Sequence, residues 1–248
     1  MTYQPQLPQD MSIVELQTVG STNSYARDLA KDGAQPFTIV WSHEQTAGKG
    51  RQGNVWVSNR GNLFMTVILR PNIAAPLTGQ LSFIAAVALA ETLKELLPQM
   101  VNIDLKWPND LLLNGKKAAG ILLESEINGH KPVEWVIVGM GVNVSHNPDG
   151  ATCLRSLGLD TLEIGQLLEK LAMKLKSIYD LWQKNGFAPI RQEWLRYSHA
   201  IGTVINVRLP KETLTGKFMG IDAQGALQLD MPDGTTKNIA SGEVFYGV

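Results

Sequence analysis

A glycine-rich basic loop is the part of the sequence whose residue types most clearly suggest ligand chemistry. Residues 45–56 read Gln-Thr-Ala-Gly-Lys-Gly-Arg-Gln-Gly-Asn-Val-Trp and lie between two segments with the composition of β-strands. Glycine allows the backbone to approach a ligand closely, while Lys49 and Arg51 supply positive charge and hydrogen-bond donors. The loop matches neither the dinucleotide-binding glycine pattern nor the phosphate loop that ends in Gly-Lys-Ser/Thr. It favours a site for an anionic ligand, with a solvated turn as the alternative.

A polar triplet, Ser21-Thr22-Asn23, precedes a helical segment and is a second candidate for ligand binding. Each of the three residues is a good helix N-cap, and capping alone explains one of them. Three short polar side chains beside the free N–H groups of a helix N-terminus also suit a carboxylate.

A third candidate is the pentapeptide Lys-Trp-Pro-Asn-Asp at 106–110. Its proline and the following Asn-Asp predict a tight turn at the end of a strand. The pair Asn114-Gly115 then predicts a two-residue hairpin turn. Lys117 is therefore expected just past that turn, on a rigid strand.

Composition restricts the class of protein. The 248 residues are 44% hydrophobic and 18% charged, as in ordinary globular proteins, and the net charge of -1 argues against a general nucleic-acid binder. A single cysteine allows no internal disulfide and favours a reducing compartment. The N-terminus lacks a secretory pattern, and the longest apolar run, 81–90, is shorter than the ~20 residues of a membrane span. We expect a cytoplasmic protein with no membrane or DNA partner.

The pattern of elements predicts an α+β (mixed α/β) fold, in which helices flank a central mixed β-sheet and a small SH3-like antiparallel β-barrel follows. The expected boundary divides a domain at 1–200 from a C-terminal domain at 201–248. Pro76 is expected to open a long helix whose apolar positions run from 81 to 97, and the apolar segment 135–144 is expected to be a central strand. The other expected strands are 12–19, 37–43, 62–69, 110–113, 116–125, 204–209, 214–221, 226–229 and 237–240, and the other helices are 24–31, 162–182 and 189–197.

With these motifs in their order, the chain resembles the catalytic region of biotin protein ligases. The pentapeptide at 106–110 matches the family in full, and Lys-Ala-Ala-Gly-Ile-Leu-Leu-Glu at 117–124 follows at the family's spacing. The family's glycine loop usually reads Gly-Arg-Gly-Arg-x-Gly-Arg-x-Trp, whereas Lys49 and Asn54 replace two of its arginines here. Lysine keeps the charge but loses the planar two-pronged donor.

The resemblance implies a two-step reaction. Biotin and ATP give biotinyl-5′-adenylate and pyrophosphate, and a lysine of a biotin carboxyl carrier protein, such as that of acetyl-CoA carboxylase, then attacks the activated carbonyl. Magnesium is expected to bind through the ATP phosphates, with no dedicated protein site. Larger family members carry an N-terminal DNA-binding domain, and the 20 residues before Ser21 are too few for one, so a monofunctional form without repressor activity is expected.

The resemblance also implies roles for individual residues. The implied biotin-binding residues are Ser21, Thr22, Asn23, Gln45, Lys49, Gly50, Arg51, Lys117 and Gly120. The implied nucleotide contacts are Trp56, Asn109, Lys117 and Asn143, and the implied catalytic residues are Lys117, Arg51 and Asp110. By residue type alone, Asp110 could equally be a carboxylate that forms the turn. For Trp56, packing in the core is the alternative.

Two other functions are compatible with parts of the sequence. A lipoate or octanoate ligase is an enzyme on a related fold, but the pentapeptide at 106–110 favours biotin. A non-catalytic binding module would use the C-terminal barrel for recognition, and the retained Lys117 and Arg51 argue against it. A sheet edge is compatible with a homodimer, although no sequence feature decides the assembly.

Overall fold

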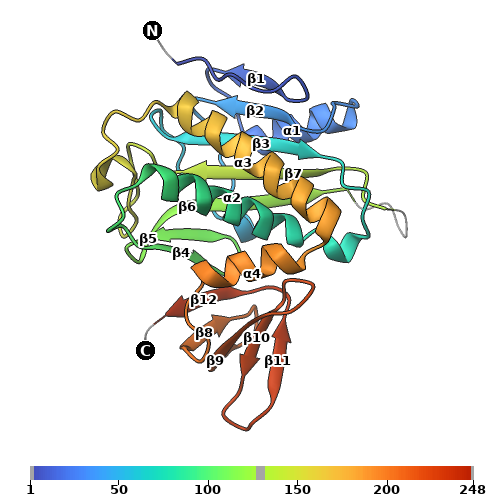
Figure 1. Cartoon of the computed structure of the whole chain (residues 1–248), viewed down its shortest axis with the longest axis vertical. Coiled ribbons are helices and arrows are strands. Elements are labelled where there is room, and N and C mark those ends of the chain that lie inside the picture. Colours follow the sequence, from blue (N-terminus) through green and yellow to red (C-terminus); the bar gives the residue numbers. More distant parts are fainter. Residues whose placement is uncertain (1–2, 127–131, 247–248) are drawn as a thin grey trace.

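A mixed β-sheet forms the larger part of the protein (Figure 1). The computed structural model describes residues 3–126 and 132–246. The strands of this sheet are β1 (Ser12–Leu16), β2 (Thr38–Ser42), β3 (Leu63–Leu69), β4 (Ile103–Lys106), β5 (Asp110–Leu113), β6 (Lys116–Ser125) and β7 (Val136–Val142). Within the described residues their order is β1-β2-β3-β7-β6-β5-β4. Strand β1 runs parallel to β2 and the other neighbouring strands are antiparallel, so the predicted central position of β7 is confirmed.

Helices cover both faces of this sheet. They are α1 (Thr22–Lys31), α2 (Gln80–Leu96), α3 (Ile164–Asn185) and α4 (Ala188–Tyr197). Side chains alternate between the two faces along a strand. Ile39 and Val67 therefore join the core with α2 and α3, whereas their neighbours Val40 and Ile68 pack against α1 on the opposite face. Helices α2 and α3 lie across the near face of the sheet in Figure 1.

Helix α2 is the central core helix. The stretch Ala75–Leu96 is long and apolar enough by composition to cross a membrane, yet 72% of its most apolar window is buried inside the protein. The expected start of this helix at Pro76 is wrong. Pro76 lies in a separate 3₁₀ turn, Ala75–Leu77, and α2 begins at Gln80, although Thr78 and Gly79 between them keep right-handed helical angles.

The hairpin of β5 and β6 is formed as predicted. Asn114 and Gly115 take positive φ angles of 49° and 75°, as a two-residue hairpin turn with the right-handed strand twist requires. Before β5, the Trp107–Pro108 peptide bond is cis, and it lies in the turn that follows β4. The hairpin places Lys117 at the start of β6, next to the turn.

A second, antiparallel sheet follows α4. Its strands are β8 (Val204–Arg208), β9 (Thr213–Ile221), β10 (Leu227–Asp230), β11 (Thr236–Ile239) and β12 (Glu243–Tyr246). Among the described residues they are ordered β11-β10-β9-β8-β12. The predicted mixed fold with an antiparallel C-terminal module is confirmed, and β12 is a strand that the sequence pattern did not indicate.

The two sheets meet through a buried tryptophan. Trp107 is 2% exposed, and its indole Nε1 donates to the carbonyl of Gly225, in the turn between β9 and β10, over 3.0 Å. The ring of Phe83 on α2 lies against the same turn, where a Cβ on Gly225 would be 2.5 Å from it. This contact leaves no room for a larger residue, so the turn is fixed against α2 and the pentapeptide.

We predict that Trp107→Phe lowers the free energy of unfolding by about 1–3 kcal/mol more than Trp41→Phe does, because it leaves the buried Gly225 carbonyl without its donor. Trp41 is a matched control, since it is 1% exposed and its Nε1 has no hydrogen-bond partner among the described residues. Urea denaturation of both variants measures the difference. Equal losses would show that the Trp107 bond contributes nothing beyond ring volume.

Candidate functional site

A cavity of about 340 Å³ opens on the sheet face that carries α1. It lies beside the N-terminus of the helix and is bounded by the glycine loop, the pentapeptide turn and the β5–β6 hairpin. The structure places all the residues singled out by the sequence analysis on its wall. These residues are Ser21, Thr22, Asn23, Gln45, Lys49, Gly50, Arg51, Trp56, Asn109, Asp110, Lys117, Gly120 and Asn143.

Glycines on β6 and β7 make room for the cavity and its wall. Gly120 and Gly141 are cross-strand partners, and the next pair on the same face joins Leu122 with Gly139. A Cβ on Gly141 would lie 2.5 Å from the indole of Trp56, and one on Gly139 would lie 2.0 Å from Asn23 Oδ1. Both distances are shorter than any real contact, so the bare backbone is required for these two side chains to approach.

One end of the cavity is a buried hydrogen-bonded cluster. Thr22 donates from its backbone N and its Oγ1 to Gln45 Oε1, over 2.8 and 3.0 Å. Gln45 Nε2 donates to Ser58 Oγ over 2.9 Å, and Thr66 Oγ1 donates to Asn23 Oδ1 over 2.7 Å. Buried polar groups with satisfied hydrogen bonds keep fixed orientations. This end therefore presents an ordered set of donors and acceptors, which suits a neutral polar group.

The side chains of the triplet at 21–23 contribute to the cavity wall and do not cap the helix. Helix α1 begins at Thr22, two residues before the expected start, with Ser21 at the N-cap position. Within the described part of the chain the Ser21 side chain makes no capping hydrogen bond, although the residue is 4% exposed. Thr22 and Asn23 use their side chains for the cluster described above.

The other end of the cavity is charged. Lys117 Nζ lies 2.7 Å from Asp110 Oδ1, and Lys106 Nζ lies 3.8 Å from Asp110 Oδ2. The Asp110 side chain is 13% exposed, so this carboxylate is held between two ammonium groups at the edge of the cavity. Lys117 Nζ also lies 5.4 Å from the centre of a Trp56 ring. Two ammonium groups face one carboxylate, so a net positive charge remains at this end to attract an anionic ligand.

Arg51 connects the glycine loop to the second sheet. Its Nη1 donates to Asn109 Oδ1 and to the carbonyl of Gly242, each over 3.3 Å. Burial lowers the pKa of Arg51, and the nearby carboxylates of Asp110 and Glu243 oppose that shift. The guanidinium therefore contributes positive charge at the junction of the loop, the pentapeptide and the C-terminal module.

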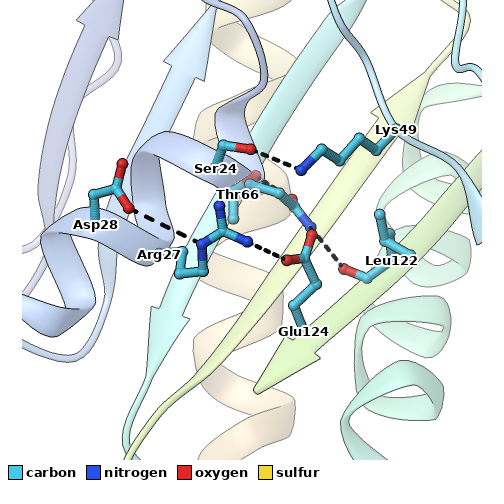
Figure 2. Close-up of polar contacts among 8 residues, drawn as sticks. Ser24, Arg27, Asp28, Lys49, Thr66, Leu122 and Glu124 are labelled. Carbon is cyan, nitrogen blue, oxygen red and sulfur yellow. Dashed lines mark hydrogen bonds and ion pairs between the residues drawn. The ribbon is translucent and has the colours of Figure 1, made fainter. Parts of the chain in front are cut away.

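The two departures from the usual loop sequence both face the cavity. Lys49 Nζ donates to Ser24 Oγ on α1 over 2.9 Å, a contact drawn in Figure 2. The backbone carbonyl of Asn54 accepts a 2.7 Å bond from Gly50 N, which closes the loop around the short 3₁₀ turn Arg51–Gly53. Lys49 thus keeps a cation at its position, while Asn54 closes the turn through its backbone.

The amides of Asn109 and Asn143 are used inside the protein. Asn109 Nδ2 donates to the Ile121 carbonyl over 2.8 Å, and Asn143 Nδ2 donates to the Thr152 carbonyl over 3.1 Å. Asn143 is 3% exposed. Both residues line the cavity, and both also hold neighbouring backbone segments in place around it.

Some residues of the site were missed by the sequence reasoning. Glu243, on β12, reaches the cavity from the second sheet, and no sequence pattern links it to the loop. Lys106 belongs to the pentapeptide, and its charge was a visible signal. Thr66 is fully buried on β3, where a lone polar residue in the apolar run Leu63–Leu69 was the available signal.

Among residues 3–126 and 132–246, no group of three or more His, Cys, Asp or Glu side chains is placed to hold a metal ion. The cavity wall carries two carboxylates, Asp110 and Glu243, and Asp110 is already paired with Lys117.

The comparisons with known proteins agree with this geometry. The model of the Biotin/lipoate A/B protein ligase family matches residues 15–143, and that of the Biotin protein ligase C terminal domain matches residues 200–247. A biotin--[acetyl-CoA-carboxylase] ligase of Paracoccus denitrificans is 40% identical, over 92% of this chain and 97% of the relative. The bifunctional ligase/repressor BirA of Bacillus subtilis is 36% identical, over 92% of this chain and 72% of the relative.

The solved structures agree with the sequence relatives. The biotin protein ligase of Aquifex aeolicus, solved in complex with biotin and ATP, is similar with a TM-score of 0.80 and 25% identity, covering 94% of this chain and 97% of that one. The similarity includes both the mixed sheet and the C-terminal module. The chain therefore belongs to the biotin protein ligase family and is a ligase.

Proposed function

We propose that this enzyme activates biotin with ATP and transfers it to a lysine of a biotin carrier domain, such as the carrier of an acetyl-CoA carboxylase. The observation that carries the proposal is the cavity itself, in which a buried hydrogen-bonded end adjoins a cationic end around Lys117. The first end suits the ureido head of biotin, and the second suits the carboxylate of biotin together with the phosphates of ATP. The name of the Paracoccus relative supports the choice of acceptor.

The first step joins two anions. An oxygen of the biotin carboxylate attacks the α-phosphorus of ATP, the bond from that phosphorus to the bridging oxygen breaks, and pyrophosphate leaves. Lys117 neutralises the charge that develops on the α-phosphate, and Lys106 and Arg51 add positive potential around it. Magnesium fits here as an ion carried by the ATP phosphates, to which it supplies charge neutralisation, with Asp110 and Glu243 as the nearby carboxylates.

The second step transfers the acyl group. The amine of the carrier lysine attacks the carbonyl carbon of the adenylate, AMP leaves, and the new amide nitrogen loses a proton. Asp110, on the cavity wall, is the carboxylate that orients the amine or accepts this proton. The glycine loop, with Lys49, Gly50 and Arg51, lies over the reactive end and limits the access of water to the mixed anhydride.

A lipoate ligase is the alternative, since the matching family model includes lipoate ligases. The buried cluster around Thr22 and Gln45 argues against it, because the dithiolane ring of lipoate has no hydrogen-bonding groups that match the donors and acceptors at this end of the cavity. The net charge of -1 also favours a protein acceptor over a nucleic-acid partner.

The decisive experiment is intact-mass analysis of a biotin carrier domain incubated with the enzyme, ATP and magnesium, with either biotin or lipoate. We expect the mass of one biotinyl group to be added in the presence of ATP, and no addition with lipoate. Modification by lipoate alone would establish the alternative. Failure with both acids, together with no biotin-dependent exchange of pyrophosphate into ATP, would refute ligase activity of this chain.

We predict that Lys117→Ala lowers adenylate formation by about a thousandfold and leaves biotin binding largely intact. A cation ~4 Å from the developing charge contributes up to ~4 kcal/mol at an effective dielectric constant near 20. Pyrophosphate exchange measures the first step, and calorimetry measures biotin binding. Lys116→Ala is the matched control, since Lys116 is the exposed neighbour on the same strand. Normal exchange by the Lys117 variant would remove this residue from the mechanism.

We predict that Arg51→Gly releases biotinyl-adenylate into solution, because it removes both hydrogen bonds of the Arg51 side chain, to Asn109 and to Gly242. Labelled adenylate, separated from the protein by rapid filtration during turnover, measures the release. Arg60→Gly is the control, since the Arg60 side chain is 55% exposed and its contacts are to Gln17 and Glu44. Release no faster than in the parent would show that the loop is retained without Arg51.

A further inference from the structure

Glu124 lies behind the polar end of the cavity and contacts it through Asn23. It is on β6, on the same sheet face as α1, and its side chain is 26% exposed. Asn23 Nδ2 donates to Glu124 Oε1 over 3.1 Å, and Arg27 Nη1 donates to Glu124 Oε2 over 3.4 Å. Figure 2 shows Glu124 facing Arg27, with Leu122 and Thr66 close by. Glu124 thus joins a cation on the surface of α1 to a buried amide of the cavity wall.

The partners of Asn23 allow one orientation of its amide. Nδ2 faces two acceptors, the Glu124 carboxylate and the Leu122 carbonyl at 3.4 Å, while Oδ1 accepts from Thr66 Oγ1. A carboxylate and a carbonyl have no hydrogen to donate. A flipped amide would place its oxygen against both acceptors and lose both bonds. Glu124 therefore fixes which end of the amide faces the cluster.

The orientation of Asn23 determines the direction of the next hydrogen bond. The Thr66 hydroxyl carries one hydrogen, which goes to Asn23 Oδ1, because that carbonyl oxygen can only accept. Thr66 Oγ1 also lies 2.9 Å from Thr22 Oγ1 but has no second hydrogen to donate to it, so toward Thr22 it can act only as an acceptor. Thr22 Oγ1 lies 3.0 Å from Gln45 Oε1, and its one hydroxyl hydrogen serves either Thr66 or Gln45, while its backbone N–H donates to Gln45 Oε1 in either case. The order of donors and acceptors is thus set from Glu124 through Asn23 to Thr66, which faces Thr22 as an acceptor.

We propose that Glu124, held by Arg27, is a positioning residue for the biotin head. Its carboxylate sets the orientation of the Asn23 amide and, through Thr66, the order of donors and acceptors that the ureido group meets. This inference rests on the proposed function, since it assigns that head to the polar end of the cavity. Glu124 acts through Asn23 and takes no part in the charged chemistry around Lys117.

The test is Glu124→Gln, which keeps the size of the side chain but adds a donor. Arg27 presents donors only, so it attracts the new amide oxygen and turns the new NH₂ group toward Asn23 Nδ2. Two donors then face each other. We expect the Kd and the KM for biotin to rise about tenfold, the effect of one unmade buried hydrogen bond. The KM for ATP and kcat at saturating biotin should stay within twofold of the parent.

A second variant separates orientation from general packing. In Arg27→Met combined with Glu124→Gln, no guanidinium competes for the amide oxygen, which is then free to accept from Asn23 Nδ2. We expect the double variant to bind biotin more tightly than Glu124→Gln alone. Asp28→Asn is the control, since Asp28 Oδ1 lies 4.0 Å from Arg27 Nε and its side chain is 74% exposed. Its KM for biotin should match the parent.

Calorimetry of biotin binding, steady-state kinetics and thermal midpoints of each variant decide the outcome. Parent-like biotin binding by Glu124→Gln would overturn the positioning role and leave the proposed function intact. Equal increases in the KM for biotin and for ATP with a lowered thermal midpoint would also overturn it, as would a double variant weaker than Glu124→Gln. A parent enzyme that binds no biotin would overturn both the proposed function and this inference.

Discussion

The close approach of side chains to bare backbone on β6 and β7 is the constraint on which the site depends. Gly139 and Gly141 face α1 and the glycine loop, and a single methyl group at either position would collide with Asn23 or Trp56. Ile137, on the same face of β7, packs with α1 in an ordinary apolar cluster. The change from isoleucine to glycine along one strand thus converts a packed interface into the wall of a cavity.

The cavity combines two environments that are separately stabilised. Its polar end is buried and hydrogen-bonded within the protein, so binding a neutral polar head there requires little reorganisation. At its charged end, the half-buried carboxylate of Asp110 lies between two ammonium groups, which reduces the cost of keeping several cations close together before a ligand arrives. In the proposed reaction, recognition of the biotin head and activation of its carboxylate would therefore depend on different residues.

The C-terminal module is part of the site's support. Trp107 bonds the turn between β9 and β10, Arg51 bonds the carbonyl of Gly242, and Glu243 reaches the cavity wall. Two of these contacts come from the pentapeptide and the glycine loop, the segments whose residues lie nearest the charged end. A displacement of the second sheet would therefore be transmitted to the glycine loop and to the charged end of the cavity.

The sequence by itself determined the mixed fold, most strand and helix positions and many of the residues that line the cavity, because hairpin turns, apolar periodicity and ordered motifs are local signals. It misplaced the start of α2 at Pro76 and missed β12, because short segments carry weak signals that tertiary packing overrides. The contacts of Glu243, Thr66 and Glu124 were decided by tertiary structure alone, since each residue meets segments that are distant in sequence. Hydrogen-bond direction and close approach depend on how strands and helices meet, which no local pattern encodes.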